Sequence, residues 1–271
     1  MLFCSIMAAG HISKRSTGSR IVSLAPSCTS ILCALGAKRQ LVAVTRWCAD
    51  VCSVRGLPAV GDCWRNDSIE KIARLRPTLI VGSVPFHAET VARILTIPAQ
   101  FLALNPRSLA DIESDVRTLA RITNRSAHGR RVIIRMRREF ARIRLQAPKF
   151  SRRPRIYSEA WPNPRISSPP WVAELIALCG GKMVVKAGAR VADEAVALAR
   201  PDIILLAWAA TGSRADPRKA FSNAAWKGVP AVHHKRVFVI RDELLNTPGP
   251  PLVAGAREIQ RILQQFARDS A

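Results

Sequence analysis

The residues of this chain with the most reactive side chains are its seven cysteines. They are Cys4, Cys28, Cys33, Cys48, Cys52, Cys63 and Cys179. No two of them form a C-x-x-C pair and no histidine lies at a metal-ligand spacing from them, so we predict no metal site. Three of them give a weak zinc or redox signal: Cys48, Cys52 and Cys63. Three others lie on apolar faces and are expected to be small core residues: Cys28, Cys33 and Cys179. The odd total argues against a fully oxidised disulfide framework.

Catalytic chemistry would need a nucleophile, a base and a group that orients the base. Glu159 with His87 or with His233 can be drawn as an acid–base pair, and Cys48 as a nucleophile. No G-x-S-x-G elbow, Walker loop or dinucleotide fingerprint accompanies them. We therefore predict no catalytic residues, no cofactor and no enzymatic activity.

Side chains suited to binding a ligand gather in loops that follow predicted strands. In open α/β sheets such loops meet at the carboxyl edge of the sheet, where ligands bind. The ligand-binding candidates in the first half of the chain are Pro26, Ser27, Trp47, Cys48, Cys63, Trp64, Pro85 and Phe86. Those in the second half are Trp161, Ser168, Trp208 and Asn246. Any single tryptophan in a loop can instead be a packing anchor, so the prediction rests on their joint placement.

Short apolar, β-branched runs predict the strands that position these loops. In the first half they cover residues 21–24, 41–45, 79–81 and 99–103, alternating with helices at 29–35, around 70, at 89–95 and at 109–122. Pro26-Ser27 is expected as the turn before the first helix and Gly36 as its end. In the second half we expect strands at 155–157, 203–206 and 237–240, a helix from Trp171 to Gly180-Gly181 and a terminal helix. Residues 159–164 and 167–170 are predicted as stiff, proline-rich loops.

One long helix is predicted in the middle of the chain, over residues 126–147. Its apolar stripe consists of Val132, Ile133, Met136, Phe140 and Ile143. Arginines fill its other faces, Ser126 can cap its start and Pro148 ends it. At 1.5 Å per residue it would run roughly 30 Å, enough to join two lobes.

The segments on either side of this helix repeat each other. Residues 69–80 and 193–204 share Glu, Ala, Arg, Pro and Ile in register, and each consists of a helix stopped by Arg-Pro and followed by a buried strand. We therefore predict two related α/β lobes with parallel sheets. The expected boundaries are a disordered or wrongly started segment at 1–19, a first lobe at 20–124, the joining helix at 125–148 and a second lobe at 149–271.

Charge and hydropathy limit the possible partners. The net charge of +23 favours nucleic acid or an anionic membrane surface, but the arginines are spread over the chain and only one tyrosine and eight phenylalanines are available to stack on bases. Nucleic-acid binding is kept as the minor alternative. No apolar run approaches the ~20 residues of a transmembrane helix.

The first twenty residues do not predict a compartment. Their apolar run has no basic segment before it, and the charges come afterwards, which is the wrong polarity for a secretory signal. Cys4 lies too near the start for lipoprotein acylation. Cytoplasmic and extracytoplasmic locations therefore both stay open.

Several motifs together resemble the cobalamin and ferric-siderophore substrate-binding proteins of ABC importers, the class III periplasmic-binding proteins. The resemblance covers residues 20–268 and is carried by Arg20-Ile21-Val22-Ser23-Leu24-Ala25-Pro26-Ser27, Leu35-Gly36-Ala37, Leu57-Pro58, Val60-Gly61, Ser68-Ile69-Glu70-Lys71-Ile72, Arg76-Pro77, Trp171-Val172, Glu174-Leu175 and Gly180-Gly181. It implies a monomer with two Rossmann-like lobes joined by one long helix, a metal chelate in the cleft between them, little closing motion and an extracytoplasmic location. Cobalamin, heme, a siderophore and a small tungstate-like anion all remain possible ligands, and Arg46, Arg65 and Arg165 lie where they could pair with an anionic one.

The resemblance also implies a contact with the importer's permease. Glu70 and Glu194 match the positions at which each lobe of these proteins offers a glutamate to permease arginines. A local role is the alternative: with Asp67 as N-cap, Glu70 would be the third residue of a capping box, and Glu194 would favour its helix dipole. A cytoplasmic ligand sensor of the same fold stays open as a second function.

Overall fold

The computed structural model describes residues 19–269. Cys4 lies outside the described residues, and so does the predicted N-terminal segment at 1–19 except for Ser19. The first lobe holds one parallel sheet in the order β3-β2-β1-β4-β5. Its strands are β1 (Ile21–Ser23), β2 (Leu41–Thr45), β3 (Ala59–Val60), β4 (Leu79–Ser83) and β5 (Gln100–Leu104).

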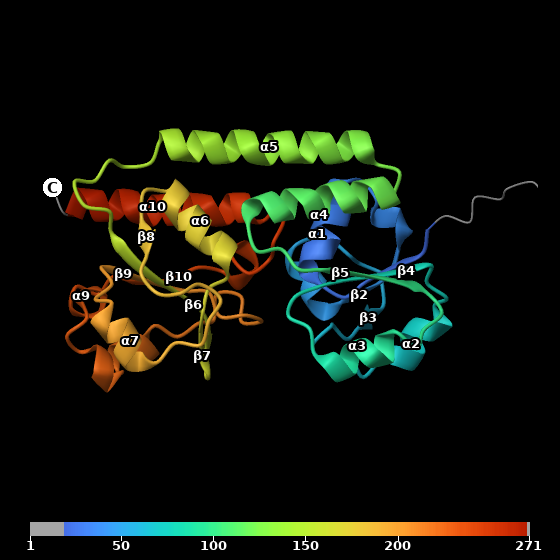
Figure 1. Cartoon of the computed structure of the whole chain (residues 1–271), viewed down its shortest axis with the longest axis horizontal. Helices are drawn as coiled ribbons and strands as arrows, with labels where there is room; N and C mark the ends of the chain where they lie inside the picture. The colour runs from blue at the N-terminus through green and yellow to red at the C-terminus, as the bar shows by residue number, and fades with distance from the viewer. Residues whose placement is uncertain (1–18, 270–271) are drawn as a thin grey trace, which may run out of the picture.

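Helices cover both faces of this sheet (Figure 1). They are α1 (Pro26–Ala34), α2 (Ile69–Arg74), α3 (Ala88–Ile94) and α4 (Leu109–Ile122), with 3-10 turns η1 (Lys38–Gln40) and η2 (Arg46–Asp50). α1 and α4 pack on one face through residues such as Ile31 and Leu119, and α2 and α3 on the other through Ile72 and Ile94. The expected turn at Pro26-Ser27 is wrong, because Pro26 is already the first residue of α1, a position where its missing N–H costs nothing.

The second lobe is built on a mixed sheet in the order β10-β9-β6-β7, with β8 paired to β6. Its strands are β6 (Arg155–Pro162), β7 (Arg165–Ser167), β8 (Lys182–Met183), β9 (Ile203–Leu206) and β10 (Val237–Val239). The proline-rich loop expected at 159–164 is wrong: β6 continues to Pro162 and turns back antiparallel into β7. β7 is the last strand in this order, and Pro162 and Pro164 lie at the turn between β6 and β7, beyond the residues of β6 that pair with β9.

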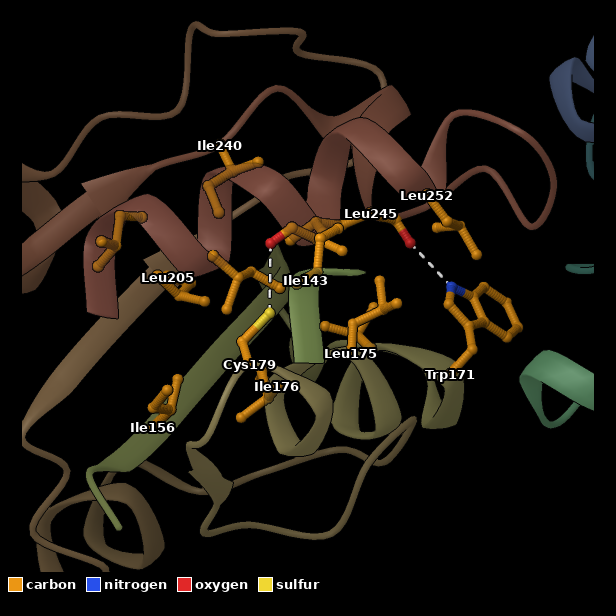
Figure 2. Close-up of a cluster of buried hydrophobic side chains, with 14 of the residues drawn as sticks. Ile143, Ile156, Trp171, Leu175, Ile176, Cys179, Leu205, Ile240, Leu245 and Leu252 are labelled. Carbon is orange, nitrogen blue, oxygen red and sulfur yellow. Dashed lines mark hydrogen bonds between the residues drawn. The ribbon is translucent and has the colours of Figure 1, made fainter. Parts of the chain in front are cut away.

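Helices cover this sheet on both faces as well. They are α6 (Pro170–Leu178), α7 (Asp193–Leu198), α8 (Arg218–Phe221), α9 (Pro230–His233) and α10 (Leu252–Asp269), with 3-10 turns η3 (Ala224–Trp226) and η4 (Asp242–Leu244). Figure 2 shows the core between α6, α10 and the sheet, where the Trp171 indole donates to the Leu245 carbonyl at 2.8 Å. Cys179 is fully buried in this core, as predicted, and burial raises its thiol pKa to about 12.

The joining helix, α5 (Ser126–Leu145), lies across both lobes (Figure 1). Ile133 packs in the first core and Met136, Phe140 and Ile143 pack in the second, which confirms the predicted stripe. Ser126 is the first helical residue rather than the cap. Since Ile112 of α4 also packs in the second core, apolar packing is continuous from lobe to lobe. We therefore propose to keep the lobe boundaries at 20–124, 125–148 and 149–271.

A disulfide between Cys33 and Cys52 joins α1 to the segment after η2. The prediction that Cys33 is a core thiol is therefore wrong, whereas Cys28 is a buried free thiol as predicted. The pair could not be chosen from the sequence because 18 residues separate the two cysteines, and only the fold brings their Cα atoms within 6.7 Å.

Asp115 on α4 gives the fold a testable pH dependence. Burial, and then the negative charge of Asp111, raise the pKa of Asp115 to about 6 from an ordinary value of 3.8. The folded chain therefore holds more protons than the unfolded chain between these two values, and stability falls as pH rises through this window. Asp115→Asn should raise the free energy of unfolding at pH 7.5 by on the order of 1 kcal/mol, after allowance for remaining solvent screening. At pH 3.5 the variant and the parent should have the same free energy of unfolding. An equal gain at pH 3.5 and pH 7.5 would contradict the raised pKa of Asp115.

Candidate functional site

The carboxyl ends of β1, β2 and β4 place the candidates of the first lobe. After β2, Trp47 lies half-buried in η2 with the Arg46 guanidinium 4.3 Å from its ring centre. After β4, Pro85 is exposed and Phe86 is half-buried against Phe101. Pro26 is half-buried at the start of α1. These residues all reach the surface at or near one edge of the sheet.

The loop that carries Trp64 is fixed by backbone hydrogen bonds. The Asp62 carboxylate accepts from the amides of Trp64 and Arg65 at 2.8 and 2.7 Å. The Trp64 carbonyl accepts from the Thr90 hydroxyl at 3.0 Å, and its ring meets that of His87 edge-on at 5.6 Å. Trp64 is nevertheless 56% exposed. A large aromatic ring exposed on a loop with a hydrogen-bonded backbone is suited to a contact with another molecule.

Other candidates of the first lobe point inward. Ser27, Cys48 and Cys63 are buried. The Cys48 thiol lies 3.0 Å from the Thr29 hydroxyl and 3.2 Å from the Thr45 hydroxyl, and burial raises its pKa. Burial likewise raises the pKa of Cys63 to about 12. Both thiols stay protonated at neutral pH, which removes the basis for a redox site or a nucleophile.

In the second lobe, the hairpin of β6 and β7 carries Trp161. This side chain is 39% exposed, and its indole N–H donates to the Asn163 carbonyl at 2.8 Å within the hairpin turn. Ser168 is fully buried and its hydroxyl lies 2.7 Å from that of Ser158. Asn246 is half-buried and donates to the Ala207 carbonyl at 2.6 Å, while its own side-chain oxygen has no partner among the described residues.

A buried carboxylate, Glu159, organises this lobe. It is 1% exposed and accepts from the Tyr157 hydroxyl and the Trp208 indole, each at 2.8 Å, and from the Arg165 guanidinium. Trp208 is consequently 5% exposed. The structure therefore pairs Glu159 with Arg165 rather than with His87 or His233, and the drawn acid–base pairs are wrong.

Arg165 connects Glu159 to α7. It donates to Asp193 at 2.6 Å and stacks at 4.3 Å on the ring of Trp226, whose indole donates to the Asp193 carbonyl at 3.1 Å. A cavity of about 200 Å³ adjoins this cluster, with Lys219 5.2 Å from the Trp208 ring. Arg165 is thus already engaged by two carboxylates, and of the arginines proposed for an anionic ligand only Arg46 and Arg65 keep exposed side chains.

A groove of about 630 Å³ runs between the lobes. The described residues that line it are Ser30, Cys33, Ala34, Asp50, Val51, Arg241, Glu243, Leu244, Pro250 and Pro251. The two walls of the groove are in close contact beside Gly249. A Cβ atom added to this glycine would lie only 2.9 Å from the Ser30 hydroxyl. None of the described ligand-binding candidates lines this groove, so it is a separate part of the lobe boundary from the aromatic loops.

Glu70 and Glu194 occupy equivalent places in the two lobes. Each is the second residue of a short helix, α2 and α7, and each is exposed. Arg76 and Arg200, which close the two helices before a proline, share positive φ values of 45° and 40°. The capping box from Asp67 is wrong, because Ser68 is the N-cap and no side chain caps the helix. Glu70 lies 3.8 Å from Arg93.

Comparison with known proteins decides the family. The model of the family described as periplasmic binding protein matches residues 21–244. The chain belongs to this family. Relatives include an ABC transporter substrate-binding lipoprotein of Bacillus subtilis, 23% identical over 89% of this chain and 78% of that protein. A vitamin B12-binding protein of Pectobacterium carotovorum is 24% identical over 89% of this chain and 86% of that protein.

The fold of solved family members agrees with this assignment. A periplasmic heme binding protein from Pseudomonas aeruginosa superposes with a TM-score of 0.78 at 18% identity, over 89% of this chain and 91% of that one. The two α/β lobes and the long joining helix predicted from the sequence are therefore confirmed. Between residues 19 and 269, no helix is long and apolar enough to cross a bilayer. Over the same range, no cluster of His, Cys, Asp and Glu is suited to hold a metal ion.

Proposed function

We propose that this protein is the substrate-binding component of an ABC importer and that it captures a metal chelate between its lobes. Relatives named for binding vitamin B12 and heme support a corrin or porphyrin ligand. A ferric siderophore is the third chelate class that we include. None of these relatives is named as an enzyme or a nucleic-acid-binding protein, so they do not favour the nucleic-acid alternative.

The observation that carries this proposal is the exposure of one large tryptophan ring on each lobe. Trp64 is 56% exposed on a loop with hydrogen-bonded backbone, its ring edge-on to His87, and Trp161 is 39% exposed with its indole bonded to the Asn163 carbonyl. Aromatic rings pre-positioned in this way lose little side-chain entropy when they stack on a flat ligand. Trp47, Pro85 and Phe86 add partly or fully exposed apolar side chains in the first lobe.

Titration of the purified chain with cyanocobalamin, hemin and a ferric siderophore tests the proposal. We expect one of the three to quench tryptophan fluorescence saturably at one ligand per chain, with a Kd of about 1 μM or tighter. If none of them binds at about 100 μM, the proposal of a chelate ligand fails.

Glu70 and Glu194 are the proposed contacts with the permease. Their side chains are exposed on equivalent helices, one per lobe, and the solvent-exposed pair of Glu70 with Arg93 at 3.8 Å would be exchanged for a permease arginine on docking. Glu70→Lys/Glu194→Lys should lower affinity for the cognate permease in detergent at least about tenfold, because two charge-assisted contacts become repulsions. Ligand affinity should not change.

The pair Glu89→Lys/Glu258→Lys, on α3 and α10, is the control for charge alone. If the Glu70/Glu194 variant docks as well as this control, the two glutamates have only a local role in their helices. In that case thermal unfolding should show a small loss of stability at Glu70, because a negative charge favours the first turn of a helix.

An extracytoplasmic location belongs to the same proposal. Relatives named as periplasmic proteins or as a lipoprotein support it, and nothing in their names supports the cytoplasmic alternative. The Cys33–Cys52 disulfide supports it independently, because such bonds persist mainly in oxidising compartments.

A further inference from the structure

The joining helix α5 is strongly basic. Within Ser126–Leu145 there are seven arginines and a single acidic residue, Glu139. The helix packs against α4, α6 and α10. It is the outermost element on its side of the molecule (Figure 1).

Four of these arginines form a line. Arg131, Arg135, Arg138 and Arg142 are all exposed, and their spacing of four, three and four residues places them within about 60° of one another around the helix. The line runs roughly 16 Å along the axis. It lies opposite the buried residues Ile133, Met136, Phe140 and Ile143. We call these four residues the arginine stripe.

Nearby carboxylates do not neutralise the stripe. Glu113 of α4 is engaged by Arg117 and Arg137, and Glu139 is engaged by Arg257 of α10. Among residues 19–269, no ion pair involves a member of the stripe. Its four guanidinium groups therefore face solvent with no carboxylate in direct contact, although Glu139 lies near enough to attract Arg138 and Arg142.

Two exposed aliphatic side chains border the stripe. Ile134 is 63% exposed and Leu145 is 85% exposed, and helical spacing places both on the same flank of it. The only aromatic residue of α5, Phe140, is buried at 9% exposure. A surface that binds single-stranded nucleic acid normally offers aromatic rings for base stacking, whereas one that lies on a bilayer combines basic and aliphatic side chains.

We propose that the arginine stripe is a docking surface for a bilayer that contains anionic phospholipids. The guanidinium groups pair with lipid phosphates, and Ile134 and Leu145 enter the interface beside them. α2 and α7 cover the opposite faces of the two sheets (Figure 1). A molecule held through α5 therefore turns Glu70 and Glu194 away from that bilayer. Attachment through the stripe and docking on an importer in the same membrane exclude each other, so the attachment must be reversible.

Vesicle sedimentation of the full chain tests this proposal. The vesicles contain phosphatidylcholine alone or with about 30% phosphatidylglycerol, at roughly 150 mM salt. We expect partitioning only into the anionic vesicles. Arg131→Gln/Arg135→Gln/Arg138→Gln/Arg142→Gln should reduce it at least about tenfold, and the matching lysine variant should keep most of it. Thermal unfolding verifies that both variants are folded.

The control removes the same charge from elsewhere. Arg39, Arg55, Arg74 and Arg153 are exposed arginines outside α5, and their joint replacement by Gln should reduce partitioning by less than about threefold. Equal losses in the two glutamine variants would mean that net charge alone attracts the vesicles, and would overturn the proposal. A stripe variant that loses binding to a short DNA duplex but keeps vesicle binding would overturn it in favour of a nucleic-acid surface.

Discussion

Replacing Phe140 by proline should leave the protein unfolded or barely folded. Proline removes an internal hydrogen bond from the middle of α5 and clashes with the preceding turn, at a cost of about 3 kcal/mol or more. The same change empties the position of a ring that is 9% exposed within the second core, which costs about a further 3–5 kcal/mol. The sum is comparable with the whole stability of a typical domain. Urea denaturation monitored by circular dichroism should show an unfolded or barely folded variant.

Phe140→Leu is the matched control, because it keeps a buried aliphatic side chain and an intact helix. It should lower the free energy of unfolding by no more than about 1–2 kcal/mol. A Phe140→Pro variant as stable as Phe140→Leu would show that α5 does not hold the lobes together.

Arg165→Met should produce the second largest loss of stability, about 3–5 kcal/mol at neutral pH. It removes the cationic partner of Glu159, which is 1% exposed, and leaves a buried carboxylate without a compensating charge. The two donors that remain, the Tyr157 hydroxyl and the Trp208 indole, are neutral and do not balance the carboxylate charge. Urea denaturation at neutral pH measures the loss.

Two further variants separate this effect from a general loss of charge. Glu159→Gln/Arg165→Met should be more stable than Arg165→Met alone, because no unpaired charge stays buried. Arg218→Met, which breaks the exposed pair with Asp216, should change stability by less than about 0.5 kcal/mol. If the double variant is no more stable than Arg165→Met, an unpaired buried charge is not the reason for the loss.

Elements with a strong local pattern were predictable from the sequence. The bounds predicted for 41–45, 109–122 and 203–206 coincide with β2, α4 and β9. Each is a sustained apolar run or an amphipathic stripe, and Ser108 before α4 and Pro201 before β9 mark where two of them begin. The long helix followed from the stripe that includes Met136 and Phe140, and the equivalence of α2 and α7 followed from the repeated Arg-Pro stop.

The hairpin of β6 and β7 was not predictable by these rules. Pro162 and Pro164 favour a loop, and nothing local shows that the chain turns back at a sheet edge where proline is tolerated. The Glu159–Arg165 pair was missed for the same reason, because it forms across that hairpin. The alternation of Tyr157 and Glu159 with Ile156 and Ser158 was the available signal, since it places the phenol and the carboxylate on one face of a strand.

Only part of the candidate site could be predicted. The reason is that residue type does not determine whether a side chain points to solvent or into the core. Trp64 and Trp161 reach solvent, whereas Trp208 turns inward to Glu159 and Cys48 turns inward to two threonines. All four follow or end a strand in the sequence. Which of them faces outward depends on tertiary hydrogen bonds, and these have no local signature.

The most direct test of the central claim is the ligand affinity of Trp64→Ala and Trp161→Ala, measured by calorimetry with hemin and with cyanocobalamin. We predict that each variant has a lower affinity than the parent for the parent's ligand, by about 1–3 kcal/mol, and the same thermal stability. Phe221→Ala removes a ring that is 40% exposed outside the candidate site and should bind as the parent does. If both tryptophan variants bind with the parent's affinity, the ligand is not held between these two side chains and the proposed site is contradicted.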